Sequence, residues 1–217
     1  KKDPEKPSEC FIFDQKQKSA VENILTESAY PFPFVITGGP GTGKTTVMVE
    51  TIIHILEKKS WAHVLVTCQS NSACDEVAFR LRKYLPPVKV YRFYSSTKAN
   101  KKSTNQDHYF ATLRENSSIQ NGVFEKPDHQ CFLKYKIVIA TMATTIRFVG
   151  KTVGNDHFDF IFIDECCAAT EPECLIPIIE LGMGYKKVNA NIILMGDDKL
   201  LGPVLHSRHA AELGLSN

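Results

Sequence analysis

The sequence predicts an α/β domain in which helices cover both faces of a parallel sheet. Six short apolar segments rich in Val, Ile or Phe recur along the chain, and segments with helical periodicity lie between most of them. A glycine-rich loop joins the first apolar segment to an amphipathic one, an order typical of α/β units. The expected strands are residues 34–37, 63–67, 88–92, 136–140, 159–163 and 191–195.

The expected helices follow from apolar spacing and from capping residues. Asp14 is placed to cap a first helix that runs through Ala20, Val21, Ile24 and Leu25. Further helices are expected at 44–58, 71–84, 142–149 and 171–181. Because parallel strands need long crossover connections, this alternation favours a parallel sheet with helices on both faces.

Size and composition limit the possible classes of function. The chain has 217 residues, of which 43% are hydrophobic, so it fits one domain or slightly more. Its net charge is only +2, so a nucleic acid would have to be bound by a local surface. No apolar run approaches the ~20 residues that span a bilayer, and we expect no membrane segment. The start is polar and lacks Met, which predicts a piece of a longer protein.

The cysteines predict free thiols in a reducing compartment. Their number is odd, no C-x-x-C pair occurs, and most lie in or beside apolar runs. A zinc site is not expected, because the spacing typical of zinc ligands is missing. The seven are Cys10, Cys68, Cys74, Cys131, Cys166, Cys167 and Cys174.

Residues 95–133 interrupt the alternation. The segment is polar, and we expect it to be an insertion that forms a solvated loop or a small helical subdomain. The alternative is a surface for a nucleic-acid backbone built on Lys98, Lys101 and Lys102. The expected organisation is a tail at 1–12, a first part of the domain at 13–94, the insertion at 95–133 and a second part at 134–217.

Gly38 to Thr45 reads Gly-Gly-Pro-Gly-Thr-Gly-Lys-Thr and fits the P-loop pattern G-x-x-x-x-G-K-[ST]. Glycines let successive N–H groups turn toward phosphate oxygens, and the helix that follows adds its positive end. Lys44 is expected to reach the β- and γ-phosphates of ATP, and the Thr45 hydroxyl to hold Mg²⁺. The residues expected to bind the nucleotide here are Gly38, Gly41, Thr42, Gly43, Lys44, Thr45 and Thr46.

Two further apolar strands end in acidic residues. Residues 158–163 lead into Asp164 and Glu165. Acids at the carboxyl end of such a strand lie beside the phosphates, so Asp164 is expected to hold Mg²⁺ and Glu165 to act as general base on water. Residues 192–196 lead into Asp197, which is placed to sense the γ-phosphate. A helix turn that favours acids is the alternative for the first pair.

The strand at 63–67 is followed by a polar turn and a helix. Asn71 or Ser72 is placed to cap that helix and to direct its N–H groups at a phosphate of a nucleic-acid backbone. Ordinary helix capping is the alternative.

These blocks together resemble superfamily-1 RNA helicases of the up-frameshift group, in the Armitage and Moloney-leukaemia-virus-10-like branch. Residues 13–21 resemble the Q motif, in which Gln17 would read adenine. Residues 69–75, 140–144, 164–173 and 196–205 resemble the family's later motifs in the family's order. The resemblance covers nearly the whole chain except 95–133.

The resemblance implies the first RecA-like domain of an ATP-dependent RNA helicase that moves 5′ to 3′. ATP and Mg²⁺ would bind here, and a second RecA-like domain of the same protein, absent from this chain, would close on single-stranded RNA. It also implies small-RNA silencing, including piRNA handling with silencing-pathway proteins, in cytoplasmic ribonucleoprotein granules. The residues implied to touch RNA are Asn71, Ser72, Thr141 and Pro203.

The chain departs from the family pattern at several positions. Gly39 replaces a proline, Cys166 an alanine, and Ala168 and Leu200 two glutamines, of which the second contacts the γ-phosphate in the family. One alternative is therefore a degenerate, weakly hydrolysing RNA clamp. Another is a docking module that uses 95–133 or the Cys166–Cys167 surface. We expect this chain alone to hydrolyse ATP very slowly, and residues alone do not separate RNA from DNA.

Overall fold

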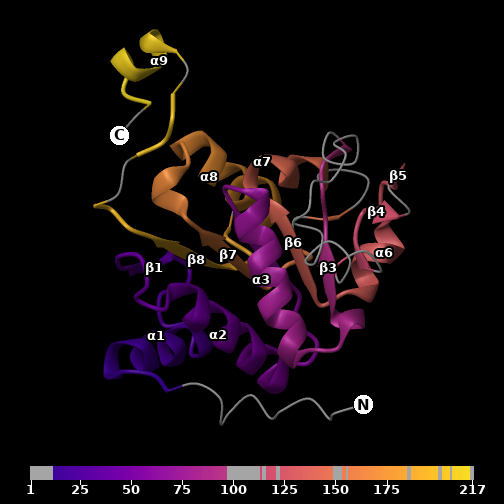
Figure 1. Cartoon of the computed structure of the whole chain (residues 1–217). Coiled ribbons are helices and arrows are strands. Elements are labelled where there is room, and N and C mark those ends of the chain that lie inside the picture. The colour runs from indigo at the N-terminus through magenta and orange to yellow at the C-terminus, as the bar shows by residue number, and fades with distance from the viewer. Residues whose placement is uncertain are drawn as a thin grey trace.

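The structure, a computed structural model, describes residues 12–96, 113, 116–120, 123–148, 153–154, 156–184, 187–199, 202–205 and 207–215. Its centre is a six-stranded sheet with the order β1-β8-β7-β2-β6-β3, and every pair of neighbours is parallel (Figure 1). The strands are β1 (Phe34–Thr37), β2 (Val64–Cys68), β3 (Val90–Arg92), β6 (Ile137–Thr141), β7 (Phe160–Asp164) and β8 (Asn191–Gly196). The six expected strands are thereby confirmed, each within about two residues of its predicted ends.

Helices follow most of these strands. They are α1 (Gln15–Leu25), α2 (Lys44–Lys58), α3 (Asn71–Tyr84), α6 (His129–Lys134), α7 (Met142–Thr145), α8 (Glu171–Pro177) and α9 (Arg208–Glu212). The bounds predicted for α2 and α3 are confirmed without change. Asp14 caps α1 as predicted, because its Oδ1 accepts a hydrogen bond of 2.8 Å from the Gln17 N–H.

Two expected helices are shorter than predicted. The helix at 142–149 is α-helical only to Thr145 and then tightens into a 3₁₀ turn over Ile146–Phe148. The helix at 171–181 ends as an α-helix at Pro177 and continues as a π turn over Ile178–Gly182. Pro177 has no N–H to donate to the preceding turn, which gives the physical reason for the change.

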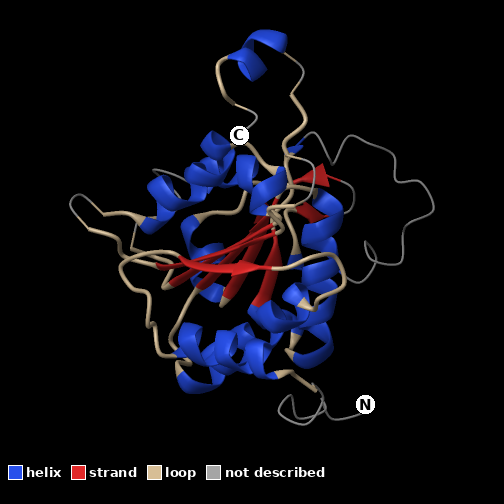
Figure 2. Cartoon of the chain, turned by 90° about the vertical axis from the view of Figure 1, so that its left-hand side faces the viewer, coloured by secondary structure: helices blue, strands red, loops and turns tan. Residues whose placement is uncertain are grey.

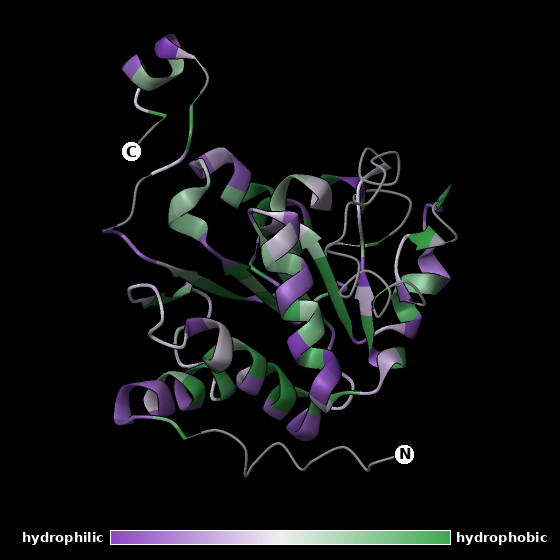
Figure 3. Ribbon diagram, viewed as in Figure 1, coloured by the Kyte–Doolittle hydropathy of each residue, from purple (hydrophilic) through white to green (hydrophobic). Residues whose placement is uncertain are grey.

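The sheet separates two apolar layers, which Figure 2 shows as helices on both of its faces. Alternate residues of one strand point to opposite sides, so Val64 and Val66 join the layer under α1, α2 and α3, whereas Leu65 joins the layer under α7 and α8. Green apolar ribbon accordingly follows the strands and the inner sides of the helices in Figure 3. Burial on both faces explains why the strands read as continuous apolar runs.

The described part of the segment 95–133 packs against the sheet. Leu113, Ile119 and Phe132 are buried, and Ser118 Oγ accepts a hydrogen bond of 2.7 Å from the Tyr94 N–H. A short antiparallel pair, β4 (Ile119–Gln120) and β5 (Val123–Phe124), precedes α6. A solvated loop is therefore wrong for the buried residues Leu113, 116–119 and Phe132, whereas residues 125–126 and 128–130 are exposed. The candidate backbone-binding residues Lys98, Lys101 and Lys102 lie outside the described residues.

Candidate functional site

The predicted site residues gather along one edge of the sheet, where the parallel strands end. Thr37 at the end of β1 pairs with Gly196 of β8, and Cys68 at the end of β2 pairs with both Asp164 of β7 and Thr141 of β6. Because adjacent strands lie about 4.8 Å apart, Asp164 and Thr141 are separated by about 10 Å along this edge. These strand ends form a row in the order of the sheet. The P-loop lies at the β1 end of this row, and the segments after β2 and β6 lie toward its β3 end.

The P-loop turns tightly between β1 and α2. Gly41 and Gly43 have left-handed backbones, with φ of 76° and 85°, which side chains rarely adopt. Lys44 is the first residue of α2, and its ammonium donates hydrogen bonds to the carbonyls of Gly38 and, at 3.0 Å, of Gly39. The Lys44 side chain is thus folded back over the loop that is predicted to bind the phosphates.

A cleft of about 560 Å³ opens above this loop. Residues 40–46 line one side, and Asp164, Glu165 and Asp197 line the other, so the ends of β1, β7 and β8 contribute together. All predicted nucleotide-binding residues of the loop except Gly38 border the cleft, and Gly38 lies directly beneath Lys44. The volume lies within the range of small-molecule sites, about 300–1,000 Å³.

Asp164 is the more buried of the two acids that follow β7, with 5% of its surface exposed. Burial raises the pKa of its carboxyl, and the Glu165 carboxylate adds to this, while the Glu165 N–H and Lys44 oppose it. The Thr45 hydroxyl borders the same cleft. A hydroxyl and a carboxylate are oxygen ligands of the kind that Mg²⁺ prefers, so these residues fit the metal.

Glu165 is exposed and has a left-handed backbone, with φ of 57°. It caps the 3₁₀ turn Cys166–Ala168, so the helix-turn alternative describes its local position correctly. Its side chain nevertheless borders the cleft. Glu165 therefore caps the turn and borders the cleft at the same time.

Asp197 follows β8 and is also largely buried, with 7% exposed. Its Oδ1 accepts a hydrogen bond of 3.0 Å from the Lys199 N–H, which leaves Oδ2 facing the P-loop. Gly196, just before it, is packed so closely that an added Cβ would lie 2.6 Å from Cys167 Sγ. The Gly-Asp pair therefore brings the end of β8 against both the P-loop and the turn after β7.

Gln17 reaches the P-loop from α1. Its Nε2 donates a hydrogen bond of 3.0 Å to the Thr42 carbonyl, and its Oε1 accepts one of 3.0 Å from the Asp14 N–H. The side chain thus supports the outer side of the loop while it completes the cap of α1. Its reading of adenine stays a prediction.

Five residues that border the cleft are not among the predicted site residues, namely Pro40, Arg80, Cys167, Ala168 and Gly196. Arg80 of α3 donates to Glu76 Oε1 at 2.6 Å and to Thr46 Oγ1 at 3.5 Å. Cys167 and Ala168 reach the cleft from the 3₁₀ turn. The spacing of Glu76 and Arg80 suggests a surface ion pair on a helix, and only the packing of α3 on α2 brings the arginine to the cleft.

The other end of the row holds the predicted RNA contacts Asn71, Ser72 and Thr141. The expectation that Asn71 or Ser72 caps α3 is wrong, because Ser70 is the cap and its Oγ accepts a hydrogen bond of 3.1 Å from the Ala73 N–H. Asn71 and Ser72 are instead the first two residues of the helix. Thr141 shares a hydrogen bond of 2.5 Å with the Thr144 hydroxyl.

Pro203 lies in the chain between β8 and α9, and its contact with RNA stays a prediction. Leu200, where the family carries glutamine, lies outside the described residues. Ala168 does border the cleft, and its carbonyl accepts a hydrogen bond from Gln69 Nε2, which ties the segment after β2 to the turn after β7.

The six described cysteines are free thiols, of which Cys68 and Cys74 are buried. Cys166 Sγ and Cys167 Sγ lie 4.0 Å apart, and burial raises the pKa of Cys166 to about 12. None of the described helices is long and apolar enough to cross a membrane.

Comparison with known proteins identifies the family. The family model described as AAA domain matches residues 12–126 and 93–208. The chain is 34% identical to a putative helicase mov-10-B.1 of Danio rerio, 32% to the RNA helicase Mov10l1 of Mus musculus and 26% to the probable RNA helicase armi of Drosophila melanogaster. These alignments cover 98%, 94% and 97% of the chain but only 21%, 16% and 19% of the relatives.

Solved structures agree on the fold. The UvsW helicase of bacteriophage T4 superposes with a TM-score of 0.52 at 14% identity, over 86% of this chain and 52% of its own. The Sulfolobus solfataricus SWI2/SNF2 ATPase core superposes with a TM-score of 0.55 at 17% identity, over 86% of this chain and 32% of its own. The RecA-like α/β fold that the family resemblance implied is confirmed. The chain therefore belongs to the AAA domain family and to the superfamily-1 helicases of the up-frameshift group, in the Mov10 and Armitage branch.

Proposed function

We propose that this domain binds ATP with Mg²⁺ and single-stranded RNA, and that it forms the first RecA-like half of an ATP-dependent RNA helicase. The observation that carries the proposal is the division of one sheet edge. The P-loop and three acids surround one cleft at the ends of β1, β7 and β8. Asn71 and Thr141 lie at the ends of β2 and β6 on the same edge.

The cleft residues suit phosphate chemistry. The loop N–H groups and the start of α2 favour an anion, and Lys44 can exchange its two carbonyl partners for phosphate oxygens. Thr45 and Asp164 would hold the metal, which supplies positive charge to the phosphates. Glu165 is positioned to take a proton from water, since it is exposed on the rim of the same cleft.

A lysine substitution tests nucleotide binding. Lys44→Ala removes a charged hydrogen-bond donor, so the affinity for a fluorescent ATP analogue with Mg²⁺ should fall about 10- to 100-fold. Lys58→Ala is the matched control, because Lys58 is an exposed lysine in the last turn of the same helix. Equal affinities of the two variants would show that the cleft is not the nucleotide site.

A second substitution separates binding from hydrolysis in the whole protein. Glu165→Gln keeps the shape of the side chain but cannot accept a proton, so RNA-stimulated ATP hydrolysis should fall about 10²-fold or more while ATP affinity stays the same. A variant that hydrolyses ATP at the parent rate would remove Glu165 from the role of general base. Restoring glutamine at positions 168 and 200 should raise the rate of RNA-stimulated ATP hydrolysis.

RNA rather than DNA is proposed because relatives in the same branch are named RNA helicases. Binding of Asn71→Ala and Thr141→Ala to labelled 20-nucleotide RNA and DNA strands tests both the site and the choice. We further propose a role in small-RNA silencing, with silencing-pathway proteins as partners in cytoplasmic granules, which rests on resemblance to Mov10l1 and armi alone. Sequencing of RNA cross-linked to the whole protein would oppose that role if piRNA precursors are not enriched.

A further inference from the structure

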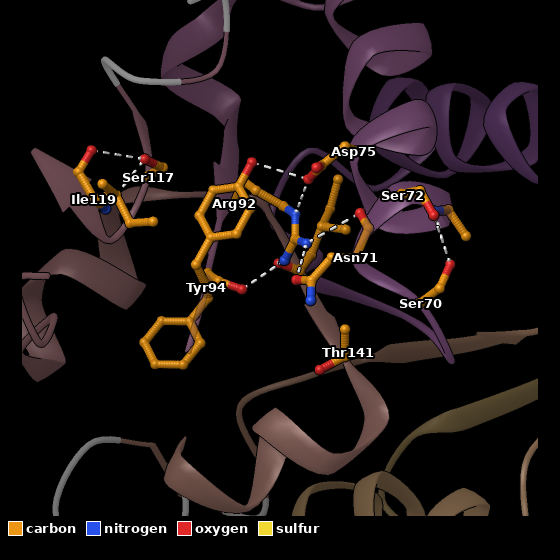
Figure 4. Close-up of polar contacts among 12 residues, drawn as sticks. Ser70, Asn71, Ser72, Asp75, Arg92, Tyr94, Ser117, Ile119 and Thr141 are labelled. Carbon is orange, nitrogen blue, oxygen red and sulfur yellow. Dashed lines mark hydrogen bonds and ion pairs between the residues drawn. The ribbon is translucent and has the colours of Figure 1, made fainter. Parts of the chain in front are cut away.

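Arg92 at the end of β3 is fully buried, with 0% of its surface exposed, yet every one of its N–H groups has a partner (Figure 4). Its Nε donates to Asp75 Oδ1 at 2.7 Å. One terminal nitrogen donates to the carbonyls of Phe93 at 2.6 Å and Ile139 at 3.4 Å. The other donates to Asn71 twice, to its carbonyl at 3.3 Å and to its side-chain Oδ1 at 2.9 Å.

Tyr94 holds the same pair from a second side. Its hydroxyl donates a hydrogen bond of 2.9 Å to Asp75 Oδ1, and its ring centroid lies 4.1 Å from the centre of the Arg92 guanidinium. The guanidinium is therefore fixed in position and in plane by residues of α3, of β6 and of the segment just after β3. A group held in this way has one orientation rather than several.

Stability alone is a weak reason for such an arrangement. Burial of an ion pair often stabilises a protein no better than apolar residues of the same volume would. Here two of the five hydrogen bonds go to Asn71, the first residue of α3, on the edge where RNA is proposed to bind. The network thus connects a buried charge to one half-buried side chain at the predicted RNA site.

The chemistry of the pair fixes which way the Asn71 amide faces. A guanidinium has only donors, so the amide oxygen must face Arg92 and the amide nitrogen must face away from it. That nitrogen donates to no protein atom among the described residues. The phosphate oxygens of an RNA backbone are hydrogen-bond acceptors, so they can accept a hydrogen bond from this amide nitrogen.

We propose that Arg92 is a positioning residue for RNA binding: it turns the Asn71 amide so that its nitrogen is presented to the RNA backbone. This inference rests on the proposed function, in which Asn71 contacts RNA. Arg92 itself, being buried, touches no ligand.

A double-mutant cycle in the whole protein tests this. Arg92→Lys keeps a charge beside Asp75 but loses the two bonds to Asn71. We expect Asn71→Ala to weaken binding of a labelled 20-nucleotide RNA about 3- to 10-fold, the effect of one hydrogen bond. Arg92→Lys should weaken it measurably but by no more than that, and a parent-like RNA affinity of Arg92→Lys would overturn the inference. The double variant should bind RNA as Asn71→Ala does, because Arg92 acts through Asn71.

Two readouts separate positioning from a general loss of structure. Affinity for a fluorescent ATP analogue should be unchanged in Arg92→Lys, since Arg92 does not border the cleft. Arg82→Lys, the same change near the other end of α3, should leave RNA affinity unchanged. Loss of both affinities in Arg92→Lys, or additive effects in the double variant, would overturn the inference while the proposed function stands.

Asn71→Asp gives a test that does not depend on weakening the buried network. A carboxylate still accepts from Arg92, but it then presents an oxygen and a negative charge to the RNA phosphates. We expect Asn71→Asp to bind RNA more weakly than Asn71→Ala does, and a parent-like affinity would overturn the inference. If Asn71→Ala itself binds RNA as the parent does, the proposed RNA contact fails and the inference fails with it.

Discussion

Gly39 and Gly43 belong to the same loop but are subject to different constraints. Gly43 has a left-handed backbone with φ of 85°, and an added Cβ would lie 2.7 Å from Gln17 Nε2. Gly39 is not among the glycines with positive φ, and an added Cβ would meet only Asp197 Oδ2, at an ordinary 3.7 Å. The departure from the family pattern at Gly39 therefore leaves the shape of the loop intact.

Alanine at these two positions should separate them. A left-handed backbone costs a residue with a side chain about 1–2 kcal/mol, so Gly43→Ala should lower ATP affinity about 10-fold. Gly39→Ala should keep the affinity and raise the free energy of unfolding by about 0.4–1 kcal/mol, because it restricts the unfolded chain. Titration with a fluorescent nucleotide and denaturant unfolding measure both, and equal losses of affinity would contradict this account.

At the scale of elements, the sequence predicted those strands and helices whose bounds depend on local residue patterns. The strands and the bounds of α2 and α3 followed from apolar spacing and the P-loop. The cap of α3 did not, because Ser70, Asn71 and Ser72 are all good capping residues and only the backbone shows which one precedes the first turn. The burial of Arg92 was also hidden, since a polar residue at a strand end normally indicates the surface.

Two capped helices offer a matched pair of variants. Asp14 caps α1, which carries Gln17 to the P-loop, and Asp128 caps α6 through a hydrogen bond of 2.8 Å from the Cys131 N–H. Asp14→Ala and Asp128→Ala should each lower the free energy of unfolding by about 1 kcal/mol. Only Asp14→Ala should also weaken nucleotide binding. A nucleotide affinity that falls equally in both variants would show that Gln17 does not support the loop.

At the scale of the whole molecule, the sheet brings together residues that are far apart along the chain. Contacts of this kind are the ones that the sequence predicts least. Ser118, in the middle of the segment 95–133, exchanges hydrogen bonds with the backbone of Tyr94 just after β3, a contact that no local pattern indicates. Arg80 reaches the cleft for the same kind of reason. Such contacts depend on how helices and loops pack, so periodicity and motif spacing do not reveal them.

Two histidines at the edge of the sheet opposite the site predict how the free energy of unfolding depends on pH. The rings of His63 and His157 stack there with centroids 4.6 Å apart, and the Nε2 atoms of both are buried without a hydrogen-bond partner. Burial, and then the charge of His63, lowers the pKa of His157 to about 4, and burial and then Lys136 lower the pKa of His63. Asp156 and Asp159 oppose these shifts.

Because the folded pKa of His157 lies below its ordinary value of 6.5, the unfolded chain binds the proton first. The contribution of His157 to stability is therefore complete above pH 6.5 and is lost as the pH falls toward 4. Urea unfolding at pH 7.5, 5.5 and 4.5 should show that the free energy of unfolding falls less with pH in His157→Phe than in the parent, because phenylalanine keeps a ring but cannot be protonated. An identical fall in the parent and the variant would show that His157 is not the cause.

The hydrogen bond from Gln69 to the Ala168 carbonyl has a thermodynamic consequence. It joins the segment that leads to Asn71 with the turn that carries Glu165. If occupancy of either half of the edge alters this bond, the two ligands share a coupling free energy, and reciprocity then applies. Saturating RNA must change the dissociation constant of ATP by the same factor by which saturating ATP changes that of RNA, and Gln69→Ala would bring both factors toward one.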